Sequence, residues 1–231
     1  MEDRSHRLWA ALTVLTGVAT LAVTFAFQML PEVAAAGGCW APGKVVDFEL
    51  ARTLDQLLKV FGPPADACRA PVVTAMDAVN HLDVRAYIPA YTAFAICAAM
   101  FLGGRFKKPL VLGAIGVALV ALAGDYLETI TLLRITQAVD GSTDLLFRSS
   151  LGAWIKFAGL ALHAFLLSRI CMAGAAPRPV LAMLLLLPMA GTAFAAIDNS
   201  RAYLMTGALA LSWTPLMLVA LRDAVRPRRK T

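Results

Sequence analysis

The sequence predicts an all-α integral membrane protein: a bundle of six transmembrane helices with an amphipathic helix in the first outer loop. Of its 231 residues, 59% are apolar and 16% are charged, whereas a soluble domain carries about 25% charged residues. The mean hydropathy is +0.70. Six apolar stretches are also long enough to cross a bilayer, which takes roughly 20 helical residues.

These six stretches are predicted to form a single membrane domain over residues 1–231. Helices are expected because the open edge of a strand cannot be satisfied in lipid. The apolar run of the first stretch is longer than the roughly 7–15 residues of a signal-peptide core, so we expect it to remain as an anchor. The predicted spans are about 8–30, 83–103, 110–134, 147–170, 179–197 and 203–221.

The placement of lysine and arginine predicts the orientation. Basic residues lie between the second and third spans, between the fourth and fifth, and in the C-terminal tail, whereas 136–144 holds two aspartates and no base. Because cytoplasmic loops carry the excess of lysine and arginine, both termini are expected in the cytoplasm of a bacterial cell, at its inner membrane. The loops 31–82, 135–146 and 198–202 are then outside. The basic residues are Arg105, Lys107, Lys108, Arg169, Arg178, Arg222, Arg226, Arg228, Arg229 and Lys230.

The same pattern accounts for the net charge of +6. The bases flank apolar segments, so the expected partner is the lipid bilayer and no nucleic acid is expected. The three histidines show no paired ligand spacing, and no nucleotide-binding motif occurs. The sequence therefore predicts no metal site and no cofactor, and His163 is expected to form an interhelical hydrogen bond.

The first outer loop contains more than a linker. Within 45–62 the apolar positions 46, 50, 54, 57, 58 and 61 follow helical spacing. Cys39 and Cys68 flank this segment on the side where disulfides persist. We predict that they pair and tie the helix down, although two free thiols are the alternative because connectivity cannot be read from sequence. Cys97 and Cys171 fall in or near spans and are not expected to pair.

Polar residues gather in the outer half of three spans. Asp125 lies nine residues before Arg134, and Lys156 nine residues after Phe147, so both are roughly 13 Å below the outer surface. Asp125 and Glu128 are one turn apart on one face. In the second span Asp83, Tyr87 and Tyr91 repeat every four residues and share a face. The residues predicted to line a ligand pocket are Asp83, Tyr87, Tyr91, Asp125, Glu128 and Lys156.

An isolated charge in mid-bilayer costs about 2.5–3.5 kcal/mol on insertion scales. Pairing Lys156 with Asp125 would relieve two such costs, and the short loop between the third and fourth spans favours adjacent helices. Glu128 is left without an obvious cation; Arg85, Arg148 or a phenol are its candidate partners. A carboxyl without a cation favours its protonated form, so Asp125 and Glu128 are candidate catalytic acids.

Three short stretches, FELART (48–53), LDVRAYIPAY (82–91) and DYLET (125–129), carry a resemblance. They are similar to the F-E-L-A-x-T, L-D-x-x-[FY]-x-P-x-Y and D-x-x-E-N stretches of an uncharacterised group of bacterial multi-pass membrane proteins. The resemblance covers about residues 45–160 and implies no activity. It marks as characteristic the positions Glu49, Asp83, Pro89, Tyr91, Asp125 and Glu128. Thr129 stands where the pattern has asparagine.

Three functions remain open on these observations. The buried acidic, lysine and tyrosine residues could line a pocket for a small lipophilic ligand. They could instead serve a membrane enzyme that uses a buried carboxyl for acid–base chemistry on a lipid or isoprenoid. A scaffold or assembly protein is the third possibility, because buried ion pairs also hold helices in register. Related halves, which would favour a transporter, are not evident in the sequence.

Overall fold

The computed structural model describes residues 2–104, 108–141, 143–173 and 177–225. Over these ranges the regular structure is helical and no strand occurs. Part of the basic loop (105–107) and the end of the C-terminal tail (226–231), which contribute to the predicted orientation, lie outside the described residues.

Six helical segments are long and apolar enough to cross a membrane, which confirms the predicted number of spans by length and composition. The segments are Arg4–Cys39, Arg69–Gly103, Pro109–Gln137, Thr143–Ala173, Pro179–Ile197 and Tyr203–Val225. They are built from α1 (Glu2–Gln28), α2 (Pro31–Ala36), α5 (Arg69–Leu82), α6 (Ile88–Gly103), α7 (Pro109–Gln137), α8 (Thr143–Ala173), α9 (Pro179–Leu184), α10 (Leu187–Ile197) and α11 (Tyr203–Val225).

The bounds of several spans differ from the prediction; the first, for example, covers Arg4–Cys39 rather than 8–30. The second span begins at Arg69 rather than at 83, because α5 continues through a π-helical turn at Asp83–Tyr87 into α6. The fifth span is interrupted by a turn at 185–186. Pro188 lies in the first turn of α10 and has no N–H, and a proline ring collides with the carbonyl four residues earlier, so the helix breaks before it, whereas α11 continues past Pro215.

The amphipathic helix expected over 45–62 is wrong in extent, because it is two helices, α3 (Gly43–Glu49) and α4 (Leu54–Phe61). Thr53 caps α4, and its hydroxyl accepts a hydrogen bond from the Gln56 N–H at 3.3 Å. In return Gln56 Oε1 accepts from the Arg52 N–H at 2.7 Å. This reciprocal capping starts a new helix, and Gly62, with φ +82°, ends it.

The chain forms two compact units, each described by itself. Unit 1 comprises residues 1–20, 90–119 and 158–231, and unit 2 comprises 21–89 and 120–157. The prediction of a single membrane domain stays a prediction.

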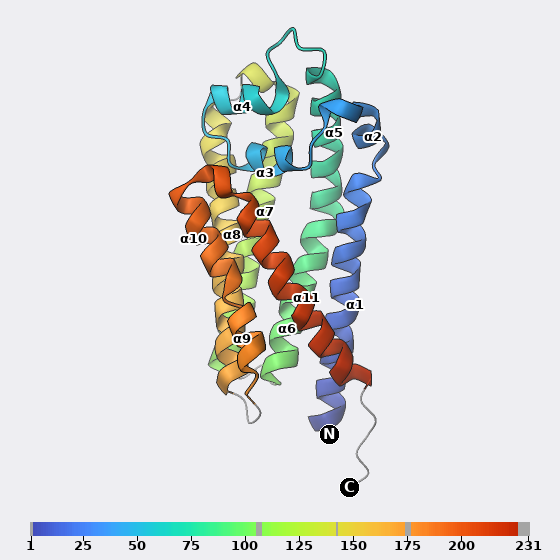
Figure 1. The fold of residues 1–231 in the computed structure, drawn as a ribbon, viewed down its shortest axis with the longest axis vertical. Helices are drawn as coiled ribbons and strands as arrows, with labels where there is room; N and C mark the ends of the chain where they lie inside the picture. Colours follow the sequence, from blue (N-terminus) through green and yellow to red (C-terminus); the bar gives the residue numbers. More distant parts are fainter. Residues whose placement is uncertain (1, 105–107, 142, 174–176, 226–231) are drawn as a thin grey trace. The chain divides into compact units, whose positions relative to one another are not determined.

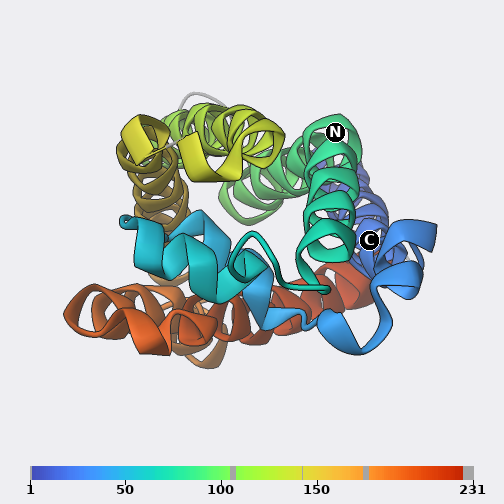
Figure 2. The same cartoon turned by 90° about the horizontal axis from the view of Figure 1, so that it is seen from above.

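Unit 1 contains α6, α9, α10 and α11 with parts of α1, α7 and α8. Figures 1 and 2 both show α10 beside α11. The two helices meet at Gly191, where a Cβ would lie 2.6 Å from the Leu204 carbonyl oxygen, so only glycine allows this approach. As expected, His163 makes an interhelical hydrogen bond, with 3.0 Å between Nδ1 and the Ala114 carbonyl oxygen of α7. The buried core includes Ala10, Phe94, Phe101, Val111, Ala114, Leu167, Leu181 and Leu216.

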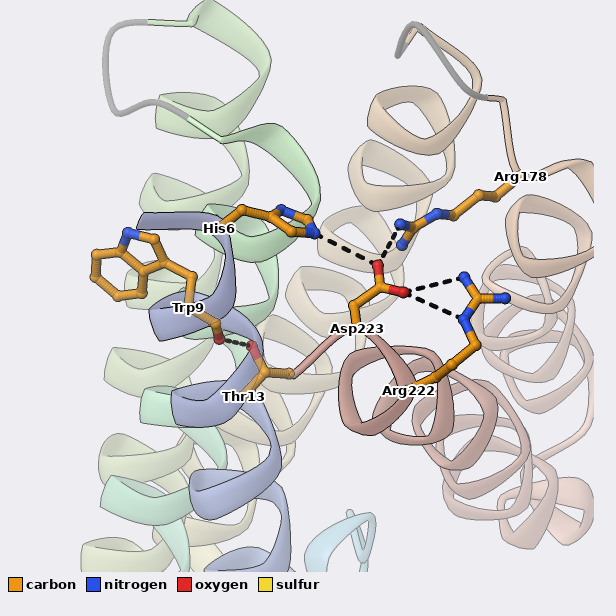
Figure 3. Close-up of polar contacts among 6 residues, drawn as sticks. All are labelled: His6, Trp9, Thr13, Arg178, Arg222 and Asp223. Atoms are coloured by element: carbon orange, nitrogen blue, oxygen red, sulfur yellow. Dashed lines mark hydrogen bonds and ion pairs between the residues drawn. The ribbon is translucent and has the colours of Figure 1, made fainter. Parts of the chain in front are cut away.

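A cluster of ionisable side chains in unit 1 surrounds Asp223 near the end of α11 (Figure 3). Its carboxylate accepts from Arg178 at 2.7 Å and from Arg222 at 3.1 Å, and His6 Nε2 lies 3.4 Å away. The Arg178 guanidinium also lies 5.4 Å from the centre of the Phe101 ring. Asp223 therefore joins α1, α11 and the segment before α9.

Unit 2 contains α2 to α5 with parts of α1, α7 and α8. Figures 1 and 2 both place α2 beside α5, where Val33 and Ala36 pack on Ala75 and Val79. The helices α3 and α4 bury an apolar face against α5, α7 and α8, and the buried residues include Phe48, Leu57, Phe61, Val72, Met76, Leu132, Ile135 and Leu146. This packing fixes the loop segment that carries Glu49.

Candidate functional site: a carboxylate–lysine cluster

The polar centre of unit 2 is the Lys156 ammonium. Its Nζ lies 2.8 Å from Glu128 Oε2, 3.1 Å from Glu49 Oε1 and 3.2 Å from Asp125 Oδ1. The side chains of Lys156, Asp125 and Glu128 are 9%, 2% and 0% exposed. We call Glu49, Asp125, Glu128 and Lys156 the carboxylate–lysine cluster. The predicted pairing of Lys156 with Asp125 is confirmed.

The sequence left Glu128 without an obvious cation and offered Arg85, Arg148 or a phenol as partners; in the structure Lys156 contacts it as well. The spacing of three residues places Asp125 and Glu128 on one face of α7, and α8 comes unusually close to that face. A Cβ on Gly152 of α8 would lie 2.6 Å from the Glu128 backbone nitrogen and 2.7 Å from the Gly124 carbonyl oxygen. Glycine at 152 therefore brings the two backbones together and lets one ammonium reach both carboxylates.

Glu49 enters the cluster from the end of α3, and reasoning from span depth missed it. The resemblance to the F-E-L-A-x-T stretch was the one sequence signal that marked it. Its helix is held in place by neighbouring contacts in unit 2: Arg52 Nε donates to Ser150 Oγ at 3.0 Å, and the guanidinium lies 6.0 Å from the Trp154 ring centre. Both partners belong to α8, the helix that carries Lys156.

A disulfide between Cys39 and Cys68 closes the segment that contains α3 and α4, as predicted. The two Cα atoms are 5.3 Å apart, with 29 residues of sequence separation. Cys97 and Cys171 are free and buried. The cross-link therefore restrains the stretch that presents Glu49 to Lys156.

Asp83 and Tyr87 lie at the two ends of the π-helical turn. Asp83 Oδ2 accepts a hydrogen bond from Thr129 Oγ1 at 2.8 Å, so α7 meets this turn one residue beyond Glu128. Tyr126 of α7 donates from its hydroxyl to the Val84 carbonyl oxygen at 3.4 Å. Single π-turns are frequently found at functional sites, and this one holds a carboxyl beside the cluster.

The two predicted tyrosines lie in different units. Tyr87 belongs to unit 2, where its side chain hydrogen-bonds Thr24 and its ring meets Phe27 edge to face at 5.4 Å between centres. Tyr91 belongs to unit 1, where it is buried and its ring stacks on Trp213 at 6.3 Å. A shared pocket containing both phenols stays a prediction.

The charges of the cluster do not balance, because three carboxyls contact one ammonium. Burial raises the pKa of Glu49 above its usual value, and the neighbouring Lys156 lowers it by less. Besides the oxygens that contact Lys156, two buried carboxyl oxygens, Glu49 Oε2 and Glu128 Oε1, accept no hydrogen bond from the described residues. The Phe157 ring lies 4.7 Å from Lys156 Nζ, which places an aromatic face beside the cation. The cluster can thus hold a proton and still accept further hydrogen bonds.

Within the described ranges, no set of three or more histidine, cysteine, aspartate or glutamate side chains is arranged to hold a metal ion. In comparisons with known proteins, no family model, no curated protein and no solved structure matches the chain. The function is therefore inferred from the geometry of the carboxylate–lysine cluster.

Proposed function

We propose that the chain is a multi-pass membrane protein that binds a small lipophilic ligand, with the polar head of the ligand held at the carboxylate–lysine cluster. Six apolar helical segments support the membrane setting. The side chains that face outward add support, because large apolar residues such as Phe25, Phe147 and Ile197 are 68%, 73% and 83% exposed. Such surfaces are compatible with lipid rather than with water.

The orientation belongs to the same proposal: a bacterial inner membrane with both termini in the cytoplasm. The disulfide lies within 31–82, the segment that the positive-inside rule assigns to the outer side. Disulfides persist in the bacterial periplasm and are rare in the cytosol. The cluster would then lie in the outer half of the bilayer, with Glu49 reaching it from the periplasmic side.

One observation carries the ligand-binding proposal: a fully buried carboxyl, Glu128, has an oxygen that accepts no hydrogen bond from the described residues. Leaving a buried acceptor unsatisfied costs about 1–3 kcal/mol, and more for a charged group. A scaffold that needed only an ion pair between α7 and α8 would require one carboxylate, yet the cluster gathers three from two elements. A ligand with a hydrogen-bonding head would complete the surplus oxygens.

Native mass spectrometry of the purified protein tests the proposal. The wild type should carry a bound lipid or metabolite that is lost in Glu128→Gln. The matched control is Asp47→Asn, which neutralises an exposed carboxylate on the same helix as Glu49 and should keep the species. If wild-type protein and both variants all lack a bound species, the ligand-binding proposal is wrong and a scaffold is favoured.

Acid–base catalysis on a lipid or isoprenoid is the second candidate, favoured by the surplus of carboxyls around one cation. In a low-dielectric site such groups cannot all ionise, so one of them keeps a proton that it can donate. A hydrophobic carbodiimide, which modifies protonated carboxyls, should label Glu128 or Asp125 at neutral pH. Chemical turnover of the co-purified species, lost in Glu128→Gln while the variant stays folded, would distinguish an enzyme from a binding protein.

A further inference from the structure

The electrostatic balance around Lys156 selects the charge of any group that joins it. Three carboxyls, those of Glu49, Asp125 and Glu128, contact this ammonium, and the Asp83 carboxyl accepts from Thr129 next to Glu128. Arg52, a cation beside α8, is already engaged by Ser150 and the Trp154 ring. A second cation brought to this place would neutralise surplus negative charge, whereas an anion would be repelled, since like charges brought together cost several kcal/mol.

The immediate surroundings of Lys156 Nζ are also those of an ammonium-binding site. Three carboxylate oxygens lie between 2.8 and 3.2 Å from the nitrogen, and the Phe157 ring lies 4.7 Å away. Carboxylates and aromatic faces together recognise ammonium groups, through charge-assisted hydrogen bonds and cation–π attraction. Lys156 thus shows which chemical group this part of unit 2 accepts.

A separate observation points to a ligand rather than to the lysine alone. Glu128 is 0% exposed, Lys156 engages its Oε2, and its Oε1 accepts nothing from the described residues. An ionised carboxylate oxygen can only accept hydrogen bonds. When Glu128 is ionised and the proton of the cluster lies on another carboxyl, the missing partner of Oε1 is a donor, and beside these carboxylates a cationic donor is favoured over a neutral one.

We propose that the ligand is a lipophilic amine, and that its protonated amino group binds Glu128 beside the Lys156 ammonium. This inference rests on the proposed function and names the chemical class of its ligand. The amine would donate to Glu128 Oε1, and its apolar chain would lie among the membrane-spanning helices. Fatty acids, whose heads are anionic, should bind more weakly for the same reason.

Competition between amphiphiles of equal chain length tests the ligand class. The purified protein is placed in phosphatidylcholine nanodiscs, and binding of radiolabelled dodecylamine is measured against unlabelled dodecylamine, dodecanol and dodecanoate. We expect saturable binding in which the amine competes at least tenfold better than the alcohol, and dodecanoate competes least. Equal or better competition by dodecanol or dodecanoate would overturn the amine proposal, and this comparison needs only the wild-type protein.

Two variants add a readout that a structural role alone would not give. Glu128→Gln should weaken amine binding at least tenfold, whereas Asp47→Asn should leave it unchanged. Lys156→Met removes the competing ammonium and should strengthen amine binding at least tenfold; weaker binding in a folded Lys156→Met protein would contradict the proposal. If no probe binds although mass spectrometry finds a species lost in Glu128→Gln, the amine class fails and the ligand-binding function stands. If no probe binds and mass spectrometry finds no species that is lost in Glu128→Gln, both the amine class and the ligand-binding function are wrong.

Discussion

Replacing Lys156 by methionine removes the one cation that contacts three buried carboxyls. Methionine keeps the length and apolar stem of lysine, so the change acts mainly through charge. Removing one partner of a buried ion pair costs about 3–5 kcal/mol, because the other partner is left uncompensated. We expect Lys156→Met to lower the free energy of unfolding by that amount near neutral pH.

The free energy of keeping a carboxyl protonated at neutral pH gives the same magnitude independently. Without the ammonium, the native variant must keep one more carboxyl protonated than the wild type does. Protonating a carboxyl with an ordinary pKa of about 4.3 at pH 7 costs about 4 kcal/mol. Above that pKa the native variant binds more protons than its unfolded state, so its stability falls by about 1.4 kcal/mol per pH unit. The gap between wild type and variant should therefore widen by about 3 kcal/mol between pH 5 and pH 7.5.

The assay is denaturant unfolding in detergent micelles, followed by circular dichroism at both pH values. The control is Lys59→Met, which removes an exposed lysine of α4 in the same unit and should change stability by no more than about 0.5 kcal/mol. A loss that is the same at both pH values would show that the destabilisation does not come from uncompensated carboxyl charge. A variant as stable as the wild type at pH 7.5 would show that the contacts of Lys156 with the three carboxyls do not stabilise the fold.

Four further outcomes are expected. Gly152→Ala should destabilise by about 1–3 kcal/mol in an unfolding titration, since its Cβ would collide with backbone, whereas Gly116→Ala, with open space around its Cβ, should not. Cys68→Ser should cost about 2–4 kcal/mol by removing the disulfide, and a reducing agent should give the same loss in wild type but no further loss in the variant. Because the pKa of Glu49 is raised above 4.5 by burial, its ionisation opposes docking; hydrogen exchange of 43–53 should speed up as pH rises from 4.5 through the folded pKa, and less in Glu49→Gln. Asp223→Asn should destabilise by about 1–3 kcal/mol, since Arg178, Arg222 and His6 lose their acid but are 27%, 56% and 37% exposed and stay hydrated, and full wild-type stability would contradict that role.

Some features of the fold were predictable because they depend on properties that can be counted along the chain. The six apolar segments, the pairing of the two outer cysteines, and the depth match of Asp125 with Lys156 follow from apolar length and residue counts. Local breaks were harder to predict. The start of α4 was readable as Thr53-x-x-Gln56, a capping pattern, but the continuing apolar stripe concealed it.

The full membership of the carboxylate–lysine cluster could not be predicted from the sequence. Counting residues along a helix gives the depth of a side chain but not its distance from another helix. That distance depends on which glycines face a neighbour, and in unit 2 the backbones approach each other at Gly124 and Gly152. Glu49, from a loop, could not be placed by depth at all.

The amino-acid sequence therefore predicted six apolar segments long enough to span a membrane, with acidic and basic groups within them, and it favoured the Cys39–Cys68 disulfide over two free thiols. These properties follow from composition and spacing, since burying charge in lipid is costly for any arrangement of helices. Only the tertiary structure shows that one lysine contacts three carboxyls and that Glu128 Oε1 accepts no hydrogen bond from the described residues. Hydrogen bonds and ion pairs act over about 3 Å, so only the packed backbones set which of these groups meet.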